Sequence, residues 1–129
     1  MSFLGAGAVR QRIPPYRSRA LLDMSAGEVC VRCGRVHKSE TTVGAHYTGV
    51  RRDAYCGGLG VKVHDCLVAD LCDECHAYMD AQSRDKEGRW GHSEEMQHYI
   101  LLTVARRFIT GKWRIARKSD ALPEAEVNT

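Results

Sequence analysis

The chain has 129 residues, 43% hydrophobic and 27% charged, which allows one domain with a single core and argues against wholesale disorder. No apolar run approaches the roughly 20 residues that span a bilayer, and the apolar N-terminus lacks the form of a secretory signal, so we expect a cytoplasmic protein without a membrane segment. The net charge is +3, but Lys and Arg gather near positions 10–19, 51–52 and 106–118, a distribution that suits a polyphosphate partner.

The first half of the chain predicts few regular elements. Residues 1–16 contain two glycines and two prolines, and we interpret them as a flexible basic arm. Residues 17–25 have the composition of a short helix. Residues 41–47 begin with β-branched side chains and predict a strand, which the glycine-containing residues 49–60 follow as a long loop.

Helices dominate the prediction for the second half. The apolar residues 67–69 lead toward a helix that we expect to begin at Cys75 or His76. A longer helix is predicted over residues 93–110, because Ser93 is a good N-cap and apolar side chains recur at helical spacing up to Phe108. These apolar side chains are expected to cover the core.

The last residues predict a strand and a tail. Residues 112–116 alternate in character and are expected to form a final short strand, whereas residues 119–129 are predicted to be disordered. The folded domain is therefore predicted to cover residues 17–118. The mixture of short strands and helices predicts an α+β fold.

Six cysteines in a chain of this size call for an explanation. Because cytoplasmic thiols stay reduced, a disulfide framework is disfavoured. Four of them form two C-x-x-C knuckles, and two such turns supply four sulfurs in a tetrahedron, which is the coordination of a structural zinc ion. The predicted zinc ligands are Cys30, Cys33, Cys72 and Cys75. We expect the other two, Cys56 and Cys66, to be small buried residues.

Three further residues suggest chemistry. His76 and Asp80 are four residues apart, so on a helix they share one face and supply two ligands for a divalent ion. His46 lies on the predicted strand and is a candidate general base, since a neutral imidazole accepts a proton near neutral pH. The remaining histidines are expected at the surface: His37, His64, His92 and His98.

The order of these motifs resembles the HNH nucleases, the zinc-stapled branch of the ββα-metal (His-Me finger) superfamily, and is closest to the YbcO-like nucleases of lambdoid phages and prophages. The motifs that carry the resemblance are Gly44-Ala45-His46-Tyr47, Cys56-Gly57-Gly58-Leu59-Gly60, His64-Asp65, and Cys72-Asp73-Glu74-Cys75-His76 with Asp80. The resemblance implies a small zinc-stapled ββα-metal domain with an added C-terminal helix and short strand. It also implies a phage- or prophage-encoded endonuclease acting on DNA, with phage recombination or replication proteins as further partners.

The resemblance implies a role for each site residue. His46 would deprotonate the attacking water, and His76 with Asp80 would hold one Mg²⁺ or Mn²⁺ ion at the scissile phosphate. Asp65 would either orient His46 or join the metal ligands. Ala45 stands where many HNH enzymes have a metal ligand. The coordination of the ion would therefore be completed by water or by Asp65.

Basic residues would bind the flanking phosphates without reading sequence. The candidates are Arg51 and Arg52 in the loop, and Arg17 and Arg19 in the first basic cluster. A different class of function uses the same cysteines and basic clusters. In that alternative the chain is a non-catalytic zinc module that binds nucleic acid or a partner protein, and His46 and Asp80 have no chemical role.

Overall fold

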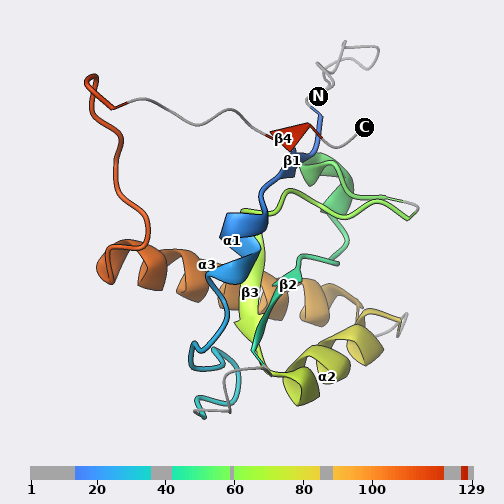
Figure 1. The fold of residues 1–129 in the computed structure, drawn as a ribbon. Helices are drawn as coiled ribbons and strands as arrows, with labels where there is room; N and C mark the ends of the chain where they lie inside the picture. The colour runs from blue at the N-terminus through green and yellow to red at the C-terminus, as the bar shows by residue number, and fades with distance from the viewer. Residues whose placement is uncertain (1–13, 36–41, 59, 85–88, 121–125, 128–129) are drawn as a thin grey trace.

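The computed structural model describes residues 14–35, 42–58, 60–84, 89–120 and 126–127 (Figure 1). These residues form a small α+β domain with two antiparallel strand pairs and three α-helices. In chain order the elements are β1 (Tyr16–Arg17), α1 (Arg19–Asp23), β2 (Val43–His46), a 3₁₀ helix (Arg52–Tyr55), β3 (Val68–Leu71), α2 (Asp73–Ser83), α3 (Arg89–Ile109) and β4 (Glu126–Val127). Figure 1 shows α3 crossing behind the β2–β3 pair, α2 at its lower end and the β1–β4 pair at the top.

The β2–β3 pair lies at the centre of the domain. Ala45 is opposite Ala69 in the antiparallel register, and all four residues of β3 are buried. Because side chains alternate along a strand, Ala69 and Leu71 point to the same face. There they join the apolar core with Met79 of α2 and Met96 of α3. The predicted strand and the predicted apolar run therefore form the two paired strands on which the helices pack.

The other face of β3 carries a buried acid. Asp70 is 1% exposed and forms ion pairs with two arginines of α3, Arg106 and Arg107. Arg107 also donates to Ser25 Oγ, in the turn after α1, across 3.2 Å. Its guanidinium is buried, and burial lowers the pKa of Arg107. Asp70 and Arg107, which are far apart in the sequence, thus pair inside the fold.

The second cysteine knuckle spans the beginning of α2. Cys72 is the extended residue just before the helix and Cys75 lies in its first turn, where the amide of His76 donates to the Cys72 carbonyl. Asp73 and Glu74 add negative charge at the helix N-terminus, which favours helix formation there. The helix therefore begins at Asp73, two residues earlier than the first of its two predicted starts.

The long helix α3 also begins earlier than predicted. Ser93 is not its N-cap but a buried residue within it, whose hydroxyl donates to the Arg89 carbonyl and accepts from the amide of Val50, both at 2.8 Å. Gly111 follows the helix with a positive φ of 80°, a conformation that glycine adopts without strain.

Of the helices that the structure describes, none is both long and apolar enough to cross a bilayer.

The predicted strand over residues 112–116 is wrong, because this segment folds back against the end of α3. The Trp113 amide donates to the Arg107 carbonyl at 3.0 Å, and the Trp113 ring packs edge-to-face on Phe108 with centroids 5.5 Å apart. The strand found near the C-terminus is β4, which pairs with β1 in the register Tyr16↔Val127. β4 lies within residues 119–129, for which disorder was predicted.

The predicted N-terminal features are shorter in the structure. The helix predicted over residues 17–25 is reduced to α1, with Ser18 as its N-cap accepting from the Leu21 amide. Residue 17 belongs instead to β1. Of the predicted arm, residues 1–13 lie outside the described part of the chain.

The buried Asp70 predicts a large stability effect. Replacement of Asp70 by Ala leaves Arg107, which is 2% exposed, inside the fold without a counter-charge. We expect the free energy of unfolding to fall by about 3–5 kcal/mol, measured by urea denaturation. The control is Asp23→Ala, which breaks the exposed Arg19–Asp23 pair and should cost about 0.5 kcal/mol or less. Equal effects of the two substitutions would contradict this account.

Candidate functional site

The four cysteines of the predicted knuckles meet in one cluster. All their sulfur atoms lie within 4.8 Å of one another, and only Cys33 is not fully buried. The first knuckle follows α1 and is attached to β3, because the amide of Val31 donates to the Asp70 carbonyl at 2.9 Å. The second knuckle belongs to α2. The cluster therefore joins the segment before β2 to the beginning of α2.

This cluster fits a structural zinc ion. With zinc–sulfur bonds of about 2.3 Å, a tetrahedral site separates its sulfurs by about 3.8 Å, which is compatible with four sulfurs that all lie within 4.8 Å of one another. Backbone groups of both knuckles, opposed by burial, lower the pKa of Cys30 to about 7, whereas burial raises the pKa of Cys75 to about 12. Thiolates held this close together repel one another, and a divalent ion between them removes this repulsion.

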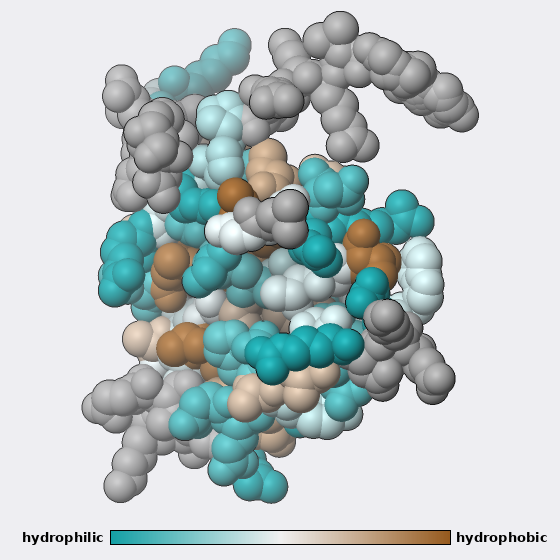
Figure 2. Space-filling view, turned by 90° about the vertical axis from the view of Figure 1, so that its right-hand side faces the viewer, coloured by the Kyte–Doolittle hydropathy of each residue, from teal (hydrophilic) through white to brown (hydrophobic). Residues whose placement is uncertain are grey.

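A cavity of about 640 Å³ lies beside α2. Its walls come from β2 and the residues after it, from the loop over residues 58–63, and from one face of α2. His46, His76 and Asp80 all line it. Figure 2 views the molecule from this side, where hydrophilic side chains predominate and hydrophobic ones are scattered. Three residues that were singled out from two separate motifs thus face one solvent-accessible space.

His46, at the end of β2, is held by Asp65. The distance from His46 Nε2 to Asp65 Oδ1 is 2.8 Å, and both side chains are largely buried. Asp65 also accepts from the Ser18 amide at 2.8 Å and pairs with Arg17 at 3.4 Å. Burial lowers the pKa of His46, and the nearby Asp65 carboxylate partly opposes this. The imidazole is therefore neutral at neutral pH, with Nε2–H directed at Asp65 and Nδ1 left as the basic atom.

Asp65 contacts the histidine and does not line the cavity. Of the two roles predicted for it, the geometry favours orientation of His46 over metal binding. The neighbouring His64 is also not in the cavity lining, and its Nδ1 accepts from the Tyr16 amide at 2.8 Å. It therefore holds β1 against this loop and is partly exposed.

His76 and Asp80 form a pair one helical turn apart on α2. His76 Nε2 lies 3.6 Å from Asp80 Oδ2, with side chains 39% and 45% exposed. They offer two ligand atoms to the cavity. Among the described residues, only the four cysteines bring three or more potential ligands together. A cation at His76 and Asp80 would therefore complete its coordination with water or substrate oxygens.

The predicted phosphate-binding arginines differ in their availability. Arg52 lines the cavity and Arg51 is exposed next to it. Arg19 is exposed and pairs with Asp23. Arg17 has a different role from the predicted one, because its largely buried guanidinium donates to the carbonyls of Val63 and Lys62 and pairs with Asp65.

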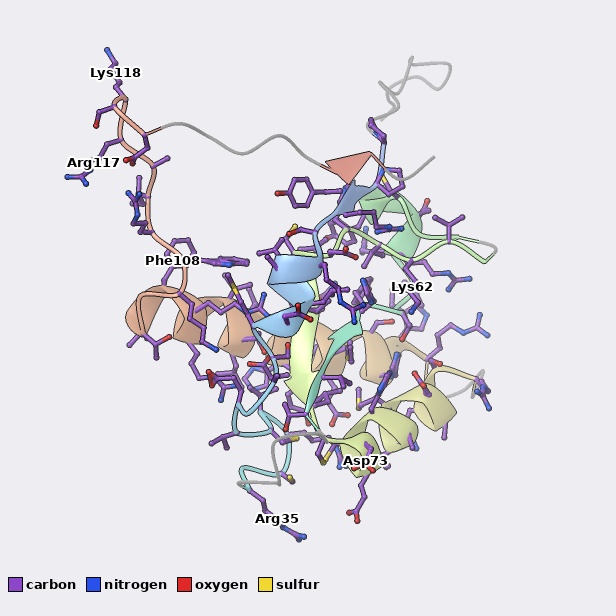
Figure 3. All side chains as sticks on the ribbon, viewed as in Figure 1. Arg35, Lys62, Asp73, Phe108, Arg117 and Lys118 are labelled. Carbon is purple, nitrogen blue, oxygen red and sulfur yellow. The ribbon has the colours of Figure 1, made fainter. Side chains whose placement is uncertain are left out.

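The Lys and Arg residues of the third basic group, near positions 106–118, also differ in their availability. Arg106 and Arg107 are held by Asp70, whereas Arg117 and Lys118 lie on a segment that extends away from the body of the domain (Figure 3). Basic residues that are adjacent in sequence therefore do not form one basic surface.

Two residues near the cavity were not identified from the sequence. Lys62 lines it beside His46, and Figure 3 shows Lys62 on the same side of the domain as α2. The feature of the sequence that could have identified Lys62 is a basic residue close behind the glycine-containing residues 49–60. His92, expected at the surface, is 3% exposed, because α3 begins earlier than predicted and this residue falls inside it. Its Nε2 lies 3.1 Å from the hydroxyl of Thr48, a cavity residue.

Cys56 and Cys66 remain outside the cluster and are half-buried. Cys66 therefore serves as a matched control for a zinc prediction. We expect about one zinc ion per chain in purified protein, with loss of the metal and of the folded circular-dichroism spectrum in Cys72→Ser. Cys66→Ser should keep both the zinc ion, measured by elemental analysis, and the circular-dichroism spectrum of the folded protein. Full zinc content in Cys72→Ser would contradict the four-sulfur site.

Comparisons with known proteins do not add to these observations: no family model matches the chain, and neither the curated proteins nor the solved structures include a match. The resemblance to HNH nucleases therefore rests on the motifs quoted above. The structure itself supports a small α+β domain with a four-cysteine cluster suited to zinc.

Proposed function

We propose that this protein is a metal-dependent endonuclease of the HNH type that hydrolyses DNA phosphodiester bonds. One observation carries the proposal: an oriented, neutral histidine and a histidine–aspartate pair face the same cavity. They come from β2 and α2, which are far apart in the sequence. A general base and a set of oxygen and nitrogen ligands are the groups that metal-assisted phosphodiester hydrolysis requires.

The arrangement of the elements also supports the ββα-metal resemblance. β2 and β3 are antiparallel neighbours, and α2 follows β3 after a single residue. The candidate base lies at the end of β2, whereas the candidate ligands lie on α2. In this proposal the four-cysteine cluster is structural, since it fixes the beginning of α2 and so the position of His76, which directly follows Cys75.

The protein's own residues would divide the work as follows. His46 accepts a proton from the attacking water at Nδ1, and Asp65 stabilises the imidazolium that forms. His76 and Asp80 would hold one Mg²⁺ or Mn²⁺ ion, which would neutralise charge on the phosphate and the leaving oxygen. Arg52 would bind a flanking phosphate without reading base sequence.

The direct test is the nicking of supercoiled plasmid DNA by purified protein. We expect activity that requires added Mg²⁺ or Mn²⁺ and that falls by about 10²–10⁴-fold in His46→Ala, because the base is lost. Asp80→Ala should lower the apparent affinity for the divalent ion. Agarose-gel quantification of nicked circles over a metal titration measures both effects.

His98→Ala is the matched control, because His98 is an exposed histidine on α3 that does not line the cavity. It should leave the nicking rate unchanged. If the wild-type protein binds DNA but never cleaves it under any divalent ion, the non-catalytic zinc module becomes the better description. Equal loss of activity in His98→Ala and His46→Ala would also argue against the assigned base.

The pH dependence offers a second test. The base works when neutral, so log kcat/KM should rise with pH up to the pKa of His46 and then level off. Burial lowers the pKa of His46, so the plateau should begin below about 6.5. Asp65 favours the charged imidazole, so Asp65→Asn should move the rise to still lower pH and reduce the plateau, measured at saturating Mg²⁺. A rise displaced to higher pH in Asp65→Asn would contradict the pairing.

A further inference from the structure

Arg32 lies inside the first knuckle, between the ligands Cys30 and Cys33, but its side chain reaches the second knuckle. Its Nη1 donates to Cys75 Sγ at 3.5 Å. Its guanidinium carbon lies 3.8 Å from the centre of the Tyr78 ring, one turn further along α2. One arginine therefore contacts both the sulfur and the helix that the second knuckle begins.

The contact with Glu95 of α3 does not account for this position. Arg32 Nε is 3.6 Å from Glu95 Oε2, and among the described residues this buried Nε has no hydrogen-bond partner. The Glu95 carboxylate is engaged instead by the Tyr99 hydroxyl. The hydrogen bond that the guanidinium does make here is to sulfur. Cys75 is thus the chemically specific partner of Arg32, and Glu95 is a more distant counter-charge.

A divalent ion held by four thiolates carries a net charge of about −2 at the site, and this cluster is largely buried. Negative charge out of water is costly unless positive charge or donors lie beside it. A donated N–H also withdraws electron density from the sulfur, which makes it less prone to protonation and to attack. Arg32 is placed to supply both effects at Cys75.

We propose that Arg32 is a positioning residue of the zinc site: its guanidinium offsets the charge of the thiolate cluster and holds Cys75 through a hydrogen bond to sulfur. The aromatic stacking on Tyr78 keeps the guanidinium in this orientation. The site thereby combines four ligands with one built-in cation. The inference depends on zinc binding and not on nuclease activity, so its failure and that of the proposed function are distinguishable.

The test compares Arg32→Met and Arg32→Lys in the full-length, zinc-loaded protein. Met keeps much of the length and the apolar packing but removes the charge and the donors, whereas Lys keeps the charge but not the planar fork. We expect zinc transfer to a chromophoric chelator to be about 10–100-fold faster in Arg32→Met, with Arg32→Lys between Met and wild type. Release from Arg32→Met as slow as from wild type overturns the proposal, as does wild-type protein without zinc.

Two controls separate the sulfur contact from general packing. Arg19→Met removes an exposed arginine that pairs with an exposed acid of its own helix, and it should leave the release rate unchanged. Glu95→Gln removes the counter-charge on α3 and should change the rate less than threefold. If Glu95→Gln accelerates release as much as Arg32→Met, Arg32 acts through α3 and the proposal fails.

Cobalt(II) in place of zinc gives a readout that packing alone would not move. The hydrogen bond lowers the energy of the donor electrons on sulfur, so its loss should shift the thiolate-to-cobalt charge-transfer bands to longer wavelength in Arg32→Met. The shift should be absent in Arg19→Met. Identical spectra in wild type and Arg32→Met overturn the hydrogen bond to Cys75. Should the Met variant not fold, the same comparison with Arg32→Lys decides the matter, with a smaller shift expected and no shift overturning the proposal.

Discussion

The meeting of four sulfur atoms is the constraint on which the rest of this domain depends. The central strands have only four residues each, and the apolar core is correspondingly small. A cluster that ties the segment before β2 to the beginning of α2 fixes the helix at the end where the candidate ligands lie. A bound zinc ion would add folding free energy that so small a core lacks.

Two buried acids organise the positive charge of the chain. Asp70 holds Arg106 and Arg107, and Asp65 holds Arg17. Each acid is compensated by arginines that are far away in the sequence, because a buried charge without a partner is costly. The arginines used in this way are not available to a partner. The cavity is left with cations that are not needed inside the fold, such as Arg52.

The side chains that line the cavity also differ in how firmly their contacts hold them. Asp65 is held in place by Arg17 and by the Ser18 amide, and it orients His46. His76 and Asp80 are half-exposed, which leaves them open to a cation from solvent. A buried, oriented histidine at the end of a strand thus lines the same cavity as two accessible polar side chains of a helix.

The sequence by itself determined the features that depend on short spacing: the two cysteine knuckles, the shared helical face of residues 76 and 80, and the existence of β2, α2 and α3. Local spacing suffices there because helix and turn geometry repeat over a few residues. Only the tertiary structure decided that Asp65 contacts His46, that Arg17 is internal, that His92 is buried and that residues 112–116 do not form a strand. Those outcomes depend on which distant segment offers a free strand edge or a counter-charge, and no local pattern encodes that choice.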